Sequence, residues 1–246
     1  MDSQLEWRIA TFFQYWQRRL DFIKRLDFNK NNHEANVLIY AALDALSNLW
    51  AEHIGKEDCM DIKGKRSIFD AFLSHYGGEV FKTVSLPDVW NRVDKGNTSI
   101  GRSSLPIDVI RLLREVGDRQ KPTLVDERQF RQSSDDWRLS RIVDTVLAEY
   151  PTTDCKCLES WLTISKYGAI AYKEMRSSYF HEGRLGRNSH SFSLMNSATR
   201  PTYLSGIYTT PPAIGFSADF MVKVLEDCLN AFEHASLIAE QDPVPE

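Results

Sequence analysis

The sequence is short of the residues that mark several classes of protein. Only 12 glycines and 9 prolines among 246 residues exclude collagen-like and low-complexity chains, and a hydrophobic content of 42% excludes a disordered one. Four cysteines are too few for a disulfide framework, and we expect them to stay reduced. No apolar run reaches the ~20 residues that a membrane span needs, and the first residues lack the basic and then apolar pattern of a signal peptide. We therefore expect a soluble cytoplasmic protein that does not bind membranes.

Basic charge in excess and phosphate-binding loops are also missing. Thirty Lys and Arg residues stand against 34 Asp and Glu residues, a net charge of −4, so any site for an anion must be local. Neither G-x-x-x-x-G-K-[ST] nor G-x-G-x-x-G occurs, which argues against ATP hydrolysis and dinucleotide chemistry. Cys155 and Cys157 have no second Cys or His pair at zinc-finger spacing. We expect no metal and no cofactor.

Apolar residues recur at spacings of three and four in four long stretches, which predicts amphipathic helices. Ser3 is the expected N-cap of the first helix, and Gly55 is the expected C-cap of the second. The four stretches are residues 3–28, 33–54, 157–180 and 217–240.

The rest of the chain divides into a middle block and a short loop region. Residues 56–154 carry four shorter helical patterns and are expected to form a helical insertion or a separately folded subdomain. Residues 184–216 are rich in turn formers and predict an irregular excursion or a short β-hairpin. The sequence thus predicts an all-α fold: a four-helix bundle in a single domain, residues 1–246. The bundle halves are residues 1–55 and 155–240, the insertion separates the second and third helices, and the tail is residues 241–246.

One string at the end of the third predicted helix is the richest in chemistry: residues 172–184, which contain Arg176 and His181. Five residues leave these two side chains about 140° apart on an ideal helix, yet a flexible Arg and a His in the last turn could meet at one phosphate. An Arg supplies a permanent forked cation for phosphate oxygens, and a His with a pKa near ~6.5 can give or take a proton. That pair is what RNA cleavage without a metal requires.

The string from Arg176 to His181 resembles the R-x4-6-H signature of the HEPN (higher eukaryotes and prokaryotes nucleotide-binding) superfamily. The alanine-rich stretch 37–50 resembles an early helix of that group, and His181-Glu-Gly-Arg184 resembles its common ending. The similarity covers roughly residues 1–54 and 157–240. It implies a homodimer in which two such motifs face one another and form one composite RNase site.

The same resemblance implies a role for each motif residue. Arg176 would orient and neutralise the scissile phosphate, and His181 would act as general acid or base. Attack by the 2′-hydroxyl would then leave a 2′,3′-cyclic phosphate without a metal ion. Ser177 stands where active members most often carry Asn, Asp or His. The further residues expected to contact substrate are Ser177, Tyr179, Glu182, Arg184, Arg187 and His190.

The segment from residue 173 to residue 200 is locally basic. Five basic residues stand there against two acidic ones, a local charge of +3 that could follow a phosphate backbone. Among nearby aromatic residues, Phe180 is expected in the core, whereas Tyr203 and Tyr208 remain candidates for stacking on bases. A second group of basic residues, between residues 111 and 141, is interleaved with acidic ones and is expected to form a solvated face.

Two functions follow from these observations. The first is a HEPN-like, metal-independent endoribonuclease of the toxin or defence kind, whose partners would be RNA, a second copy of the chain, and an antitoxin or regulatory protein. The alternative is a non-catalytic helical module for dimerisation, for docking an adaptor partner, or for binding a nucleotide or RNA.

Overall fold

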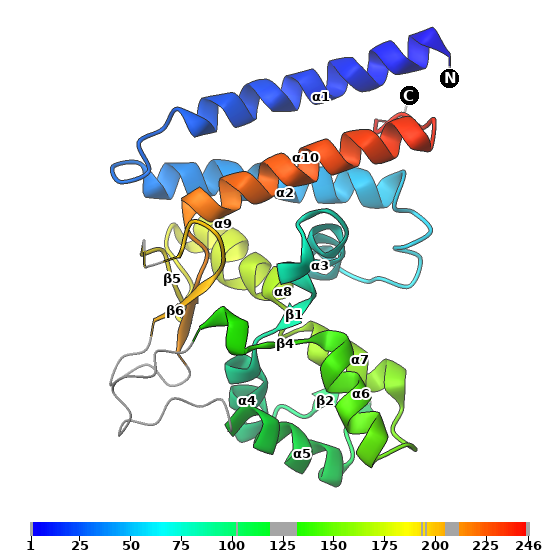
Figure 1. Ribbon diagram of the computed structural model, residues 1–246, viewed down its shortest axis with the longest axis vertical. Coiled ribbons are helices and arrows are strands. Elements are labelled where there is room, and N and C mark those ends of the chain that lie inside the picture. Colours follow the sequence, from blue (N-terminus) through cyan, green and yellow to red (C-terminus); the bar gives the residue numbers. More distant parts are fainter. Residues whose placement is uncertain are drawn as a thin grey trace.

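The computed structural model describes residues 2–101, 103–118, 132–192, 194, 196–204 and 212–244, and it is mainly helical. Long helices lie side by side at one end of the molecule, and four shorter helices gather at the other end (Figure 1). The long helices are α1 (Ser3–Lys24), α2 (Asn32–Glu52) and α10 (Ala218–Ile238). The shorter ones are α4 (Leu86–Asp94), α5 (Ile107–Asp118), α6 (Leu139–Glu149) and α7 (Cys155–Thr163).

The three long helices confirm the predictions that the apolar spacing makes for residues 3–28, 33–54 and 217–240. Helix α10 packs against both α1 and α2, and the rings of Phe13 and Phe232 meet edge to face at 5.4 Å between centroids. The caps differ from those expected. Asp2, not Ser3, caps α1, because its side chain accepts a hydrogen bond from the Gln4 amide. The C-cap of α2 is His53, two residues before the predicted Gly55.

The predicted continuous helix over residues 157–180 is wrong. The chain forms α7, turns at residues 164–166, and resumes as α8 (Tyr167–Ile170), the π-helix η3 (Ala171–Ser177) and α9 (Ser178–Glu182). The break follows from tertiary hydrogen bonds. Ser165 accepts the Ser85 amide with its carbonyl oxygen and donates its hydroxyl to Asp88, and both of these partners lie far back in the sequence. Local periodicity cannot report such distant partners.

Two hydrophobic cores form. The larger core includes side chains of α1, α2, α8, η3 and α10, together with Phe69 and Phe72 of α3 (Lys65–Tyr76). The smaller core joins α4, α5, α6 and α7, and its fully buried members include Leu113 and Trp161. Helix α3 lies within residues 56–154 of the sequence, but its side chains belong to the larger core, with those of the long helices.

Short strands and 3-10 turns complete the fold. Strand β1 (Thr83–Val84) pairs with β4 (Trp137–Arg138), and β2 (Ser99–Ile100) pairs with β3 (Ser103–Ser104), both antiparallel. The region of the predicted hairpin holds a three-stranded sheet in the order β5-β7-β6, in which β7 (Ala213–Gly215) runs antiparallel to β6 (Thr202–Leu204) and parallel to β5 (Ser189–His190). The 3-10 turns are η1 (Glu79–Lys82) and η2 (Ser133–Asp135).

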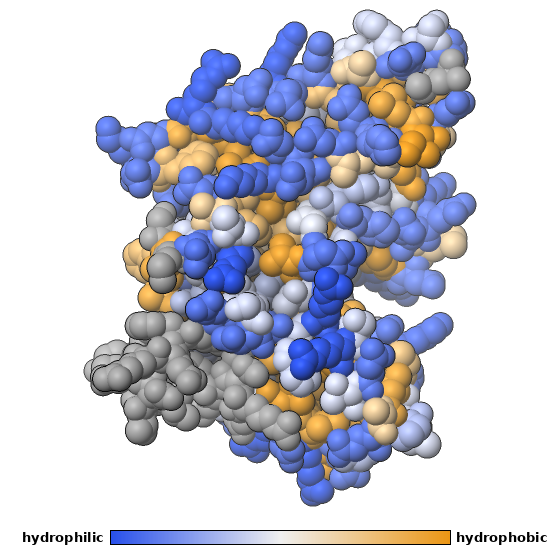
Figure 2. Space-filling model, in the orientation of Figure 1, coloured by the Kyte–Doolittle hydropathy of each residue, from blue (hydrophilic) through white to orange (hydrophobic). Residues whose placement is uncertain are grey.

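Hydrophilic residues cover most of the face in view, with small apolar areas between them (Figure 2). Within the described part of the chain, no helix combines the length and the apolar character needed to cross a membrane. All four cysteines are unpaired thiols, of which Cys228 is buried.

Candidate functional site

Arg176 lies near the end of the π-helix η3, where it faces the middle of α2. Its Nη2 atom donates to Oδ2 of Asp44 at 2.8 Å, and the two side chains are only 16% and 13% exposed. The guanidinium also lies over the rings of Tyr172 and Phe180, at 5.3 and 4.9 Å from their centroids. A carboxylate and two rings thus hold the cation in one orientation.

Part of the ion pair still has hydrogen-bonding capacity. The Nε atom of Arg176 and the Oδ1 atom of Asp44 are buried and have no hydrogen-bond partner among the described residues. Buried donors and acceptors in folded proteins are nearly always satisfied.

Asp44 was not among the residues that the sequence singled out. It is the only acidic residue between positions 35 and 51, a stretch that is otherwise apolar or small and polar. A lone carboxylate in such a helix is costly to bury without a partner. That isolation was the signal that could have pointed to Asp44.

The π-helix is stabilised by the chain that follows it. The carbonyl oxygen of Glu174 accepts the Gly186 amide at 2.8 Å and the Ser189 hydroxyl at 3.4 Å, so the loop after α9 folds back onto η3. Residue 186 has no room for a side chain, because a Cβ atom there would lie 2.9 Å from both the Cα and the carbonyl oxygen of Glu174. π-helical turns are frequent at functional sites.

His181 lies in the last turn of α9 and is exposed. Gly183, in the left-handed conformation with φ of 64°, ends the helix two residues later. The imidazole can therefore reach a ligand in solvent. The contacts of Arg176 within the described residues are those with Asp44, Tyr172 and Phe180, and none of them is with His181.

The two aromatic residues before His181 exchange their expected positions. Phe180, expected in the core, is 44% exposed, whereas Tyr179, expected to contact substrate, is 6% exposed and packs against His33 and Tyr40. Burial raises the pKa of Tyr179 to about 12. Neighbouring helical residues point about 100° apart, so one can be buried while the next is exposed.

His190 is also placed differently from the expectation of an RNA contact. Its ring is buried in the small sheet, where Nε2 bonds to the Thr202 carbonyl oxygen at 3.0 Å. Burial lowers the pKa of His190 and so favours its neutral form. Tyr203 is likewise buried and bonds through its hydroxyl to Ser85 and Asp136. Tyr208 lies outside the described residues.

The remaining predicted contacts lie on the surface beside α9. Glu182 and Arg184 are exposed and form an ion pair at 3.2 Å, Arg187 is exposed, and Ser177 is half-buried. Elsewhere in the basic segment, Lys173 pairs with the neighbouring Glu174 at 2.9 Å. Asp44 adds a negative charge that the local count of +3 did not include, which lowers the charge of this region to +2.

The basic residues between positions 111 and 141 are described in part. Arg111 and Arg114 form exposed ion pairs with Asp108 and Asp94, as expected of a solvated face. Residues 119–131 lie outside the described residues.

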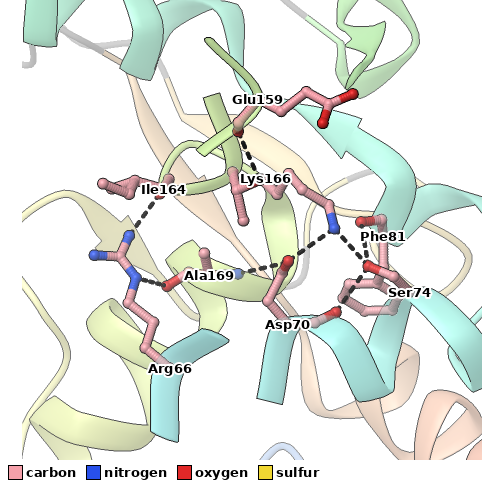
Figure 3. A network of polar contacts seen from close by, with 9 residues as sticks. Arg66, Asp70, Ser74, Phe81, Glu159, Ile164, Lys166 and Ala169 are labelled. Atoms are coloured by element: carbon pink, nitrogen blue, oxygen red, sulfur yellow. Dashed lines mark hydrogen bonds and ion pairs between the residues drawn. The ribbon is translucent and has the colours of Figure 1, made fainter. Parts of the chain in front are cut away.

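A second polar cluster lies where α3 meets α8 (Figure 3). Nζ of Lys166 donates to Oδ2 of Asp70 at 2.7 Å and to the Ser74 hydroxyl at 2.6 Å, and the Lys166 and Asp70 side chains are 9% and 3% exposed. Burial raises the pKa of Asp70, against the opposing effect of the Lys166 ammonium. Arg66 donates to the carbonyl oxygens of Ala169 and Ile164. This cluster borders a cavity of 670 Å³, and its bonding makes it a clamp between helices.

Comparison of the chain with protein-family models, with curated proteins and with solved structures finds no significant match. Over the described residues, no three His, Cys, Asp or Glu side chains gather in a group that could hold a metal ion.

Proposed function

We propose that this protein is a metal-independent endoribonuclease of the HEPN type, of the toxin or defence kind. The observation that supports it most is the arginine fixed at a helix end by Asp44, with the exposed imidazole of His181 five residues further along. A preorganised cation and a residue that can transfer a proton near neutral pH are the two groups that phosphodiester cleavage by a neighbouring hydroxyl uses.

In the proposed reaction, the 2′-hydroxyl of the ribose attacks the adjacent phosphorus and loses its proton to a base. The bond to the 5′-oxygen of the next nucleotide breaks, and that oxygen receives a proton from an acid. The products are a 2′,3′-cyclic phosphate and a free 5′-hydroxyl. Arg176 neutralises the charge that develops on the non-bridging oxygens, and Asp44 positions Arg176.

A second copy of the chain is part of the proposal. The reaction needs one base and one acid, and each motif supplies one histidine, so two facing motifs provide both. Leu38 is 38% exposed and lies on α2, the helix that carries Asp44. Phe180 is 44% exposed and lies on α9, the helix that follows Arg176. Burial of these two side chains against a second copy would remove apolar surface from water.

The experiment compares the wild type with His181→Ala and with His234→Ala, an exposed histidine on α10 that serves as the matched control. Each protein is incubated with mixed RNAs in excess EDTA, and the product ends are tested for cyclic phosphate. We expect cleavage by the wild type and by His234→Ala, and a loss of at least about 100-fold in His181→Ala. Full activity in His181→Ala, or cleavage that requires added metal, would contradict the proposal.

One observation favours the alternative of a non-catalytic helical module. The Arg176 side chain is only 16% exposed and its charge is matched by Asp44, as in a structural ion pair. A wild type that cleaves no RNA but still dimerises would support this alternative. Deletion of residues 56–153 is not a clean test of partner binding, because it would remove Phe69 and Phe72 from the bundle core.

A further inference from the structure

A cavity of 460 Å³ lies between the two hydrophobic cores. On one side it is lined by α4 and the turn that follows, and on the other by α8, η3 and β7. Arg66 of α3 borders this cavity and also the 670 Å³ cavity beside Lys166 and Asp70. The site is separate from the Asp44–Arg176 ion pair, because neither of those residues lines it.

The lining of this cavity is positively charged in a chain whose net charge is negative. Four cations stand against the carboxylates of Asp88 and Glu174, a local charge of +2. Asp88 is engaged by the Ser165 hydroxyl, and Glu174 by Lys173. The four cations are Arg66, Arg92, Lys95 and Lys173.

Arg92 is the most informative of these cations, because it is 93% buried yet incompletely bonded. Its Nη1 atom donates to the Trp161 carbonyl oxygen at 2.7 Å and to the Ser165 hydroxyl at 2.9 Å, and its guanidinium lies 4.0 Å from the Trp161 ring centroid. Its Nε atom is buried and has no partner among the described residues. Burial lowers the pKa of Arg92 to about 10, so it remains charged at neutral pH. An anionic ligand would supply the missing acceptor.

The opposite wall of the cavity includes the apolar side chains of Ile170, Pro212 and Ile214, beside Lys173 and Glu174. A cavity of this volume, with some apolar side chains and convergent polar groups in its lining, is of the size of sites for small molecules. We infer that the cavity binds a small phosphate-bearing molecule of about the size of a mononucleotide, with its phosphate at Arg92 and Arg66 and its apolar part against Ile170 and Ile214.

The burial of Arg92 favours a small molecule over an RNA strand. A phosphate inside an RNA strand is joined to a nucleotide on each side. It therefore cannot enter the cavity far enough to contact Arg92, which is 7% exposed. A terminal phosphate can enter. The inference does not depend on the proposed RNase activity, because binding is measured directly.

The test is isothermal titration of the intact protein with the four ribonucleoside monophosphates, with adenosine, with inorganic phosphate, and with a short RNA that lacks terminal phosphates. We expect at least one monophosphate to bind with a stoichiometry of one per chain, and adenosine to bind at least about tenfold more weakly. We also expect the affinity to fall as salt is raised.

Variants of residues that line the cavity test whether the ligand binds there. Lys95→Ala removes an exposed cation at the rim and should weaken binding about fivefold, whereas Asp88→Asn removes a competing negative charge and should tighten it by a similar factor. Lys63→Ala, an exposed lysine at the other cavity, is the matched control and should leave the affinity unchanged. Arg92→Gln should abolish binding, with folding checked by its thermal unfolding curve.

Three results would overturn the inference. The first is that no monophosphate binds saturably at millimolar concentration. The second is that a monophosphate binds equally well to the wild type, Lys95→Ala and Asp88→Asn, which places it elsewhere. The third is that only the RNA or only inorganic phosphate binds, which contradicts a site of mononucleotide size.

Discussion

The ammonium nitrogen of Lys166 lies 2.7 Å from the carboxylate of Asp70 inside the protein, and this ion pair ties the start of α8 to α3. The chain leaves α7 three residues before Lys166, so the pair anchors the bundle where it meets the second core. The Ser74 hydroxyl accepts a further hydrogen bond from the ammonium, and the Ala169 amide donates one to the carboxylate. A buried ion pair that is hydrogen-bonded in this way is costly to break, because removal of one partner leaves the other charge buried.

Removal of the Lys166 charge should destabilise the fold. Lys166→Met leaves the Asp70 carboxylate buried without a cation, and we expect a loss of about 3 kcal/mol in the free energy of unfolding, measured by urea denaturation. Lys63→Met, which changes an exposed lysine at the same cavity, should stay within about 0.5 kcal/mol of the wild type. Equal stability of the two variants would contradict a role for the ion pair.

The Asp44–Arg176 pair should contribute to stability. Asp44→Ala leaves a mostly buried guanidinium without its carboxylate, with an expected loss of about 1–3 kcal/mol in the free energy of unfolding. A double-mutant cycle with Arg176→Ala should give a coupling energy of about 1 kcal/mol or more. Additive single effects would show that the two side chains do not interact in solution.

Stability should fall as the pH is lowered below the ordinary pKa of histidine, about 6.5. Burial lowers the pKa of His190, so just below this pH the unfolded chain binds a proton that the folded chain does not. The contribution is fully present above pH ~6.5 and is lost as the pH falls toward the lower folded pKa, by up to about 1.4 kcal/mol per pH unit.

This pH dependence is measured by urea denaturation between pH 5 and pH 8. His190→Gln should flatten the dependence, whereas His181→Gln, a change at an exposed histidine, should leave it as in the wild type. An unchanged slope in His190→Gln would rule out His190 as its source.

Gly186 should not tolerate a side chain. In Gly186→Ala, the new Cβ atom would lie 2.1 Å from Oε2 of Glu174 and 2.9 Å from its carbonyl oxygen, so the loop after α9 must shift. We expect a loss of about 2 kcal/mol, measured by thermal or urea unfolding. Gly183→Ala meets no atom within 4 Å and should show only the cost of a left-handed backbone, about 1 kcal/mol. A smaller loss in Gly186→Ala than in Gly183→Ala would contradict this reasoning.

Phe180 should contribute to the proposed dimer. Phe180→Ser removes an exposed apolar side chain beside the motif, and we expect the dimer to dissociate at least about tenfold more readily in sedimentation velocity experiments. Trp7→Ser, a change at a 67% exposed aromatic residue of α1, is the matched control. If both variants associate like the wild type, the interface lies elsewhere.

The sequence predicted the parts of the fold that depend on local pattern. Apolar spacing was sufficient for α1, α2 and α10, because each buries one continuous face over five or six turns. It failed between residues 157 and 180, where Ser165 and Lys166 leave the helix to bond with Asp88 and Asp70. Those partners lie 77 and 96 residues earlier, and no local pattern reports them.

The candidate site shows the same division. Arg176 and His181 could be singled out as candidates from residue type and spacing, because the chemistry of a guanidinium and an imidazole does not depend on the fold. Asp44 as the partner of Arg176, the burial of Tyr179 and the exposure of Phe180 could not be found in that way. They depend on which face of the helix meets α2.

By itself, then, the sequence determined that the chain is mainly helical and where its three long helices lie, and it singled out Arg176 and His181 as candidates for phosphate and proton chemistry. The tertiary structure decided where the predicted helix over residues 157–180 breaks and how Asp44 holds Arg176. It also decided that Arg66 and Arg92 line one cavity between the two cores. The physical reason is the separation along the sequence between the groups that interact. Helix formation and side-chain chemistry are set by neighbours within a few residues, whereas buried charges are satisfied by groups far away in the sequence.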